Sequence, residues 1–260
     1  MKIKSSLFIL FSVLSLYTYA QNLDMYQKHL YVNKGDTLPY RILLPENYDA
    51  SKKYPLILVL HGAGERGNDN EKQLVHGSRL FLRDSIRKNY PAVVVFPQCP
   101  ANSYWSNVEI TRNENGKRNF EFKRCGKPTV AMALAINLLH HLQQNYSLNK
   151  EQLYIGGLSM GGMGTFELVR RKPKTFAAAF PICGGANPKT ARKLKNPSWW
   201  IFHGLKDDVV DPEFSKLMAA ALKEKGADVK LTIYPEANHN SWDPAFAEKD
   251  LLPWLFSKRK

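Results

Sequence analysis

The sequence predicts an α/β fold in which a mostly parallel sheet is covered by helices on both faces. Two continuously apolar runs, Leu56–Leu60 and Ala92–Phe96, are typical of strands that are buried on both faces of such a sheet. Along the chain, short strand-like segments alternate with segments of helical periodicity. Residues 21–260 suit a single domain of this class.

Prolines and apolar periodicity delimit the elements of the first half. Leu38–Leu44 and Ala92–Phe96 are expected strands, each followed by a proline. Thr129–Tyr146 is an expected helix, because leucines recur along it at helical spacing. The polar stretch from Pro97 to Lys127 is longer than an ordinary connection, so we expect it to be functional or mobile.

The second half continues the alternation. Leu153–Ile155 is a short expected strand that leads through glycines into an expected helix, Met160–Arg171, which stops before Pro173. The remaining expected strands are Phe176–Phe180, Trp199–Phe202 and Val229–Tyr234, and the remaining expected helices are Pro212–Lys225 and Pro244–Phe256.

The first twenty residues have the plan of a secretory signal peptide. Lys2 and Lys4 precede an apolar run, Leu7–Leu16, and the stretch ends in Thr18-Tyr19-Ala20, where a signal peptidase would cut. The run is too short to span a bilayer comfortably, which disfavours the alternative of an uncleaved anchor. We therefore expect residues 1–20 to be removed, and a secreted or periplasmic domain of residues 21–260 with no stable membrane insertion.

The chain is basic, with a formal net charge of +14. Its positive residues are scattered in pairs such as Lys52-Lys53, without a basic stripe interleaved with aromatic residues. This pattern indicates solvated surface charge and no nucleic-acid partner, although a polyanion-binding protein stays open as a rival. The sequence carries no signature of an oligomeric state.

Three cysteines, Cys99, Cys125 and Cys183, are present. Export permits a disulfide, and we expect the pair Cys99–Cys125, which flanks the long polar stretch. No spacing resembles a zinc site, so we predict no metal.

The segment from Gly156 to Gly162 carries a G-x-S-x-G pattern in which Gly157 and Gly161 bracket Ser159. An expected strand precedes it and an expected helix follows, as a serine on a sharp strand-to-helix turn requires. Glycines on both sides let the strained turn pack closely. Ser159 is therefore the candidate nucleophile, against the alternative of an incidental serine in a glycine-rich turn.

A serine hydroxyl needs a base, and the base needs an orienting acid. Only His203 and His239 follow Ser159. His239 lies after the last expected strand and is the candidate base. His203 precedes the acidic candidates and is interpreted as a packed, hydrogen-bonded structural residue.

Three aspartates compete for the acid: Asp207, Asp208 and Asp211. Asp211 stands directly before Pro212 and has the position of a helix cap. Neighbouring residues on a turn point in different directions, so only one of Asp207 and Asp208 is expected to face His239. The pattern of residues leaves that choice open.

An oxyanion needs two backbone donors. The amide of Met160, directly after the nucleophile, is the first candidate. The second lies in the loop His61-Gly62-Ala63-Gly64, where we expect the amide of Ala63 to serve, with Gly62 as the alternative and His61 in a structural role.

The segments LHGAGERG, GLSMGGMGTF, HGLKDDVV and NHNSWD occur in the order seen in esterases of the α/β-hydrolase fold. Between Leu60 and Asp243 the chain resembles the group of feruloyl esterases, polyhydroxybutyrate-depolymerase-like enzymes and phospholipase/carboxylesterases. In relatives with HG-x-x-D-x-x-V the acid is the aspartate four residues after the histidine, which implies Asp207 here.

The resemblance implies an acyl-enzyme mechanism without a cofactor, acting on a small-molecule or polysaccharide-linked ester, with feruloyl and acetyl esters of plant polysaccharides as candidates. A prolyl-oligopeptidase-like peptidase is the rival within the fold. Trp105, near where relatives build their pocket, is expected either to bind substrate or to be a core aromatic. Trp242 is expected to line the site or to anchor the loop of His239.

Overall fold

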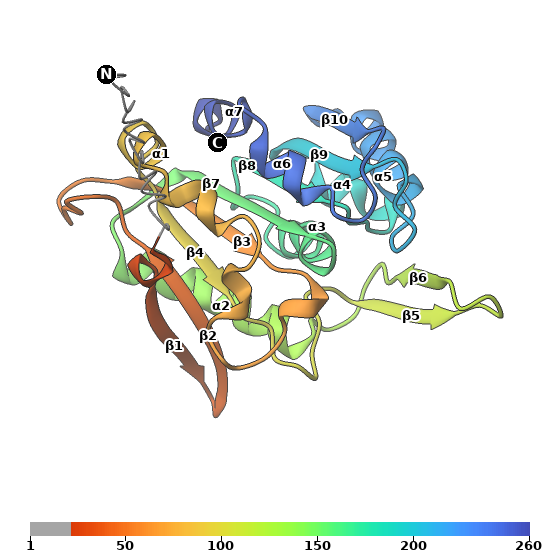
Figure 1. The fold of residues 1–260 in the computed structure, drawn as a ribbon, viewed down its shortest axis with the longest axis horizontal. Helices are drawn as coiled ribbons and strands as arrows, with labels where there is room; N and C mark the ends of the chain where they lie inside the picture. Colours follow the sequence, from red (N-terminus) through yellow and green to blue (C-terminus); the bar gives the residue numbers. More distant parts are fainter. Residues whose placement is uncertain (1–21) are drawn as a thin grey trace, which may run out of the picture.

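An eight-stranded sheet with helices on both faces forms the centre of the computed structural model, which describes residues 22–260 (Figure 1). The strand order is β1-β2-β4-β3-β7-β8-β9-β10, in which the pairs β1–β2 and β2–β4 are antiparallel and the other pairs are parallel. The strands are β1 Gln27–Asn33, β2 Asp36–Leu43, β3 Tyr54–Leu60, β4 Val93–Pro97, β7 Leu148–Leu158, β8 Ala178–Ile182, β9 Ser198–Gly204 and β10 Val229–Tyr234. The predicted α/β-hydrolase fold is confirmed.

The helices divide between the two faces. They are α1 Asp84–Asn89, α2 Val130–Asn145, α3 Met160–Arg171, α4 Ala191–Leu194, α5 Glu213–Glu224, α6 Trp242–Ala247 and α7 Leu251–Ser257. Along β3, Leu56, Leu58 and Leu60 face the core formed with α2, α3, α4 and α5, whereas Ile57 and Val59 face the core formed with α6 and α7. This alternation explains why β3 is apolar at every position. No helix within residues 22–260 has the length and apolar character needed to cross a bilayer.

Several expected elements differ from the structure in their bounds; the strand expected at Leu38–Leu44, for example, is β2, which begins two residues earlier. The expected helix Pro244–Phe256 is two helices, α6 and α7, because Glu248 leaves helical geometry with ψ 119° and accepts a hydrogen bond from the Tyr234 hydroxyl. The short strand expected at Leu153–Ile155 is the eleven-residue β7. The strand expected at Phe176–Phe180 begins two residues later, as β8.

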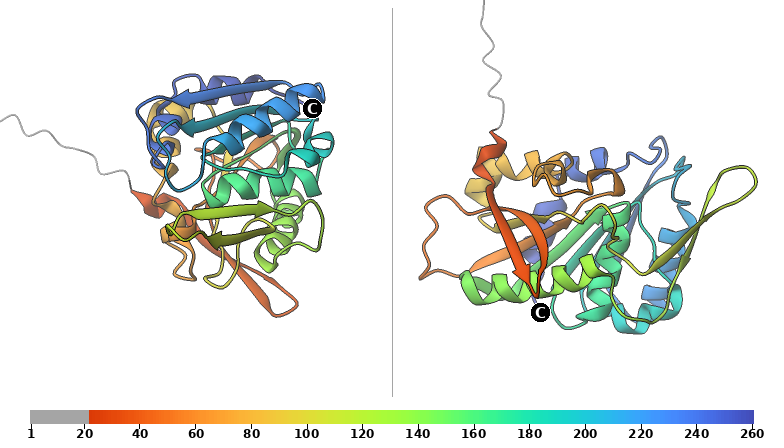
Figure 2. Two further views of the ribbon diagram at one scale, coloured as in Figure 1. Left: turned by 90° about the vertical axis from the view of Figure 1, so that its right-hand side faces the viewer. Right: turned by 90° about the horizontal axis from the view of Figure 1, so that it is seen from below.

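The stretch from Pro97 to Lys127 contains a two-stranded hairpin that stands out at one end of the sheet (Figures 1 and 2). Its strands are β5 Val108–Arg112 and β6 Arg118–Phe122. Phe120 and Phe122 pack against Phe214 on α5, with ring centroids 6.2 and 5.2 Å away, and belong to a small apolar cluster with Met163 and Val210.

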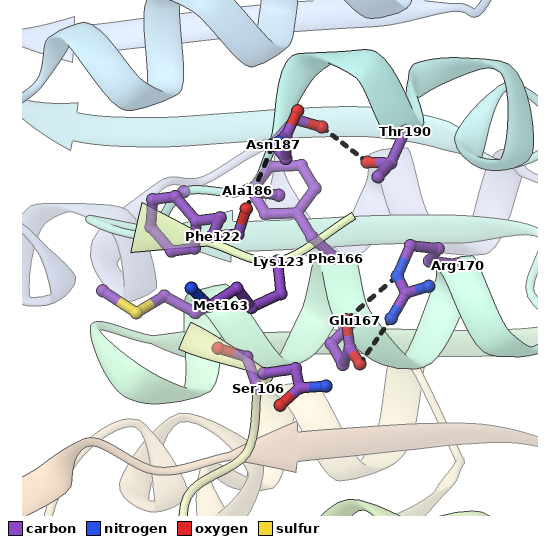
Figure 3. A pocket seen from close by; sticks show the side chains of 12 residues that line it. Ser106, Phe122, Lys123, Met163, Phe166, Glu167, Arg170, Ala186, Asn187 and Thr190 are labelled. Carbon is purple, nitrogen blue, oxygen red and sulfur yellow. Dashed lines mark hydrogen bonds and ion pairs between the residues drawn. The ribbon is translucent and has the colours of Figure 1, made fainter. Parts of the chain in front are cut away.

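A buried ionic clamp on α3 holds the base of this hairpin. Figure 3 shows one of its two ion pairs, between Glu167 and Arg170. The Glu167 carboxylate accepts hydrogen bonds at 2.7 Å from both Arg170 and Arg171. The two guanidinium groups also donate to the carbonyl oxygens of Arg124 and Gly126, just after β6. The nucleophile helix and the hairpin are therefore one packed unit.

The expected disulfide between Cys99 and Cys125 is wrong, since both thiols are free. Cys99 is buried in the core on the α2 side of the sheet, directly after β4. Cys125 is exposed, and its backbone carbonyl oxygen accepts a hydrogen bond from the Asn107 side chain. The two residues flank the stretch in sequence, but packing of the hairpin base on α3 places only one of them in the core.

His61 joins the ends of β3 and β4, in the structural role that the sequence predicts. It is buried, its Nδ1 lies 2.6 Å from the Gly62 carbonyl oxygen, and its Nε2 accepts the amide of Cys99 at 2.9 Å. These partners require a neutral imidazole with its proton on Nδ1. Burial lowers the pKa of His61 to about 4.

Replacing Glu167 with glutamine leaves two largely buried guanidinium groups without their carboxylate. We expect the variant to lose about 3 kcal/mol of unfolding free energy in urea denaturation, and to expose the hairpin to trypsin. Glu121→Gln is the control, because the Glu121 carboxylate pairs with Lys123 in solvent. Equal stability of the two variants would contradict the clamp.

The neutral state of His61 makes the fold sensitive to acid. Because the pKa of His61 is lower in the folded protein than its unfolded value near 6.5, its stabilising contribution is complete above that value and is lost as the pH falls toward 4. When the pH is lowered from ~7 to ~4.5, the free energy of unfolding of the wild type, measured by chemical denaturation, should fall by about 2 to 3 kcal/mol more than that of His61→Gln. The exposed His140→Gln control should follow the wild type.

Candidate active site

Ser159 occupies a strained turn between β7 and α3. Its backbone angles are φ 53° and ψ −116°, and residues other than glycine rarely adopt a positive φ. The flanking glycines are required by space: a Cβ on Gly161 would lie 1.9 Å from the Leu60 carbonyl oxygen, and one on Gly157 would lie 2.5 Å from it. The turn therefore presses against the end of β3 and raises the Ser159 hydroxyl at the carboxyl edge of the sheet.

The structure brings Ser159, His239 and Asp207 into one hydrogen-bonded line. The Ser159 Oγ lies 3.0 Å from His239 Nε2, and His239 Nδ1 lies 2.8 Å from Asp207 Oδ2. Asp208, the alternative acid, is exposed, and its carboxylate forms no hydrogen bond or ion pair within residues 22–260. Asp211 accepts the amide of Glu213 at 2.9 Å, the capping role expected for it.

Each carboxylate oxygen of Asp207 accepts two hydrogen bonds. Oδ1 accepts the amides of Val209 and Val210, both at 2.9 Å, and Oδ2 accepts His203 Nε2 at 3.1 Å besides His239. Burial by itself would raise the pKa of Asp207, but the hydrogen bonds from His203, His239 and the Val210 amide outweigh it and hold the pKa well below its usual range. The carboxylate is thus ionised and fixed toward His239.

His203 has a definite structural role behind this carboxylate. It is fully buried, its Nε2 faces both Asp207 and the Val210 carbonyl oxygen, and its Nδ1 lies 2.7 Å from the Ser215 hydroxyl. Because both neighbours of Nε2 are acceptors, that nitrogen carries the proton. His203 therefore orients Asp207, in keeping with its predicted structural role.

Cys183 adjoins the same group. The potential ligand atoms of Cys183, Asp207 and His239 lie within 4.8 Å of one another, a donor set that can bind zinc. However, both oxygens of Asp207 are fully engaged in hydrogen bonds, and burial raises the pKa of the Cys183 thiol well above its usual range. This chemistry favours a proton relay over a metal centre.

Two backbone amides are available for an oxyanion. Met160 opens α3 and Ala63 opens a short 3₁₀ turn, Ala63–Glu65, and neither amide donates a hydrogen bond within residues 22–260. Gly62 and Ala63 line the same pocket as Ser159. These are the two donors that the sequence predicts, and the end of α3 adds its positive dipole.

A pocket of about 360 Å³ opens above Ser159 and His239. Trp242 lines it, and its ring meets the His239 ring edge-on at 5.4 Å, so this residue both lines the site and supports the base. Trp105 does not line it. That side chain is fully buried beside His61, 5.5 Å between ring centroids, which corrects the expectation of substrate contact in favour of a core aromatic.

Three charged or titratable pocket residues were not predicted: Glu65, His76 and Arg118. His76 Nε2 lies 3.8 Å from Glu65 Oε1, and the His76 ring lies 4.9 Å from the Trp242 ring, tilted at 45° to it. The position of Glu65 directly after the oxyanion loop was a usable signal. His76 and Arg118 come from segments without a motif, and only the folded chain brings them to the pocket.

Comparisons with known proteins agree with this geometry. The model of the esterase family, described as "Putative esterase", matches residues 34–233. The chain is 28% identical over 199 residues to carboxylesterase SOBER1 of Arabidopsis thaliana, covering 71% of this chain and 82% of that protein. A crystal structure of a thermostable esterase is 33% identical with a TM-score of 0.81, over 91% of this chain and 64% of the other, so the chain spans less than two thirds of that structure.

A ferulic acid esterase from Anaeromyces mucronatus, solved with ferulic acid, shares the fold. Its TM-score is 0.62 at 16% identity, over 85% of this chain and 86% of the other. The family match covers most of the sequence and includes Ser159 and Asp207. The chain therefore belongs to the esterase family, whose reaction is the hydrolysis of carboxylic esters.

Proposed function

We propose that this chain is an exported serine esterase that releases feruloyl or acetyl groups from plant polysaccharides, with Ser159, His239 and Asp207 as its catalytic residues. The observation that carries the catalytic assignment is the unbroken line of hydrogen bonds from the Ser159 hydroxyl to the buried Asp207 carboxylate. The signal-like residues 1–20, which lie outside the described part of the chain, support export.

The geometry supports a two-stage acyl transfer. The Ser159 hydroxyl attacks the ester carbonyl carbon while His239 Nε2 accepts its proton, and Asp207 stabilises the resulting imidazolium. The amides of Met160 and Ala63 donate to the oxyanion as it forms. His239 then returns the proton to the departing alcohol, and a water molecule, deprotonated by His239, releases the acid from Ser159.

The substrate class rests on the pocket and on the relatives. The pocket is open to solvent, lies beside the aromatic ring of Trp242, and carries charged groups at its rim, features that suit a polar substrate with a planar or small acyl group. The fold likeness to the ferulic acid esterase points in the same direction.

A substrate panel tests this proposal. The purified protein should hydrolyse p-nitrophenyl acetate, methyl ferulate and acetylated xylan, and should leave proline-containing peptide amides intact. Ser159→Ala should remove activity while retaining the circular dichroism and melting temperature of the wild type. Hydrolysis of the peptides alone would favour a peptidase, and activity in the Ser159→Ala protein would remove Ser159 from the mechanism.

The adjacent aspartates give a matched pair for the acid. Asp207→Asn should lower kcat by roughly ten-thousandfold, because the amide no longer holds the His239 proton on Nδ1. Asp208→Asn should leave kcat unchanged, since that side chain is exposed and, within residues 22–260, forms no hydrogen bond with His239. The measurement is kcat for p-nitrophenyl acetate at neutral pH, and a reversed order would transfer the role to Asp208.

A further inference from the structure

One face of the β5–β6 hairpin ends in a pair of arginines, Arg112 and Arg118, of which Arg118 lines the active-site pocket. The strands pair Val108 with Phe122, Ile110 with Phe120 and Arg112 with Arg118. Because side chains alternate along a strand, Arg118 projects from the same face as the buried Phe120 and Phe122. Phe120 and Phe122 pack from this face against Phe214 on α5, and Arg118 lines the pocket that contains Ser159.

Arg118 differs from the other cations of the hairpin in its surroundings. Lys123 pairs with Glu109 and Glu121, both at 2.8 Å, and Lys117 pairs with Asp211 at 3.8 Å. Within residues 22–260 no carboxylate forms an ion pair with Arg118 or Arg112. The pocket thus receives an uncompensated guanidinium.

The position opposite Arg118 also carries a positive charge. Arg112 is its direct cross-strand neighbour, and like charges in that position repel each other. Arg112 donates a 2.8 Å hydrogen bond to the Gly116 carbonyl oxygen. An anion held at the two guanidinium groups would remove the repulsion.

The hairpin is a firm platform for such contacts. The Glu167 clamp fixes its base, and the phenylalanines of β6 pack on α5. The backbone that carries Arg118 is therefore anchored beside the pocket, which lowers the loop entropy lost on binding. The other charged residue of the pocket, Glu65, lies on the oxyanion loop beside His76, so the pocket carries positive charge on its hairpin side.

We propose that Arg118, with Arg112 beside it, binds a carboxylate carried by the ester substrate. A guanidinium recognises a planar carboxylate through two parallel hydrogen bonds, which suits this task better than an ammonium group. Preferred substrates are then carboxylate-bearing esters, such as esters on uronate-containing polysaccharides. The net charge of +14 favours the approach of such acidic polymers. The inference rests on the proposed function only in taking Ser159 as the residue that cleaves the ester.

Two matched substrate pairs test it. In the first pair, 4-acetoxybenzoate carries a carboxylate on its leaving group, and 4-acetoxybenzamide is its neutral counterpart. In the second pair, monomethyl adipate carries a carboxylate at the end of its acyl chain, and methyl hexanoate is its neutral counterpart. In one of the two pairs, Arg118→Gln should lower kcat/KM for the anionic member about tenfold, mainly through KM, and leave the neutral member unchanged. Arg118→Lys should restore part of the loss, and added salt should weaken only the anionic reaction.

Arg124→Gln is the control, because Arg124 is exposed just beyond the hairpin and does not line the pocket. It should leave both pairs unchanged. Equal losses for anionic and neutral substrates in Arg118→Gln, or no loss for either pair, would overturn the assignment of Arg118. Failure of the wild type on every neutral ester would instead contradict the proposed esterase site itself, so the two failures are distinguishable.

Discussion

The buried carboxylate of Asp207 connects the parts of the chain that form the site. It is approached by the imidazole of His203 at the end of β9, by two amides of its own loop, and by His239 from the loop after β10. A buried charge of this kind is costly unless every acceptor position is used. The two oxygens of Asp207 accept four hydrogen bonds, so the groups that stabilise the carboxylate also fix the orientation of the base.

The sheet explains why these segments meet. The loops after β3, β7, β9 and β10 all leave the carboxyl edge of neighbouring parallel strands. The first supplies the Ala63 amide, the second Ser159, the third Asp207 and the fourth His239. Close packing at this edge is permitted by Gly161 and Gly157, whose missing side chains leave room for the Leu60 carbonyl oxygen. The strain at Ser159 is supported by that packing.

Features with a local cause could be predicted from the sequence. The apolar runs of β3 and β4, the bounds of α3 and β10, and the serine turn follow from composition, prolines and glycines near each other in the chain. The alternation of exposed residues along β1, by contrast, indicates an edge strand only once β2 is known to pair with it. The break at Glu248 depends on Tyr234, which is distant in sequence.

The site shows the same division. The sequence around Asp207 and Asp208 did not show which of them is the acid, and only the motif shared with relatives favoured Asp207. In the fold the two differ plainly, because Asp207 is buried and contacts His203. The expected disulfide was wrong because the positions of Cys99 and Cys125 at the two ends of one stretch do not show which of them is buried in the core. Nothing in the sequence indicated that Arg118 lines the pocket, because its position depends on the pairing register of β5 and β6.

The attachment of the hairpin to α3 has a consequence for how specificity can vary. Helix α3 begins directly after Ser159. About two turns further along, it carries Glu167, whose ion pairs hold the base of the hairpin. The hairpin also packs through Phe120 and Phe122 against Val210 and Phe214, and the Val210 amide donates one of the hydrogen bonds to Asp207. Side chains at the hairpin tip, such as Arg118, make no contact needed by the catalytic line. A change there alters the charge presented to the substrate and leaves the acid, base and nucleophile in place. The proposed recognition by Arg118 and the catalytic line therefore share the support of α3 but use different hydrogen bonds.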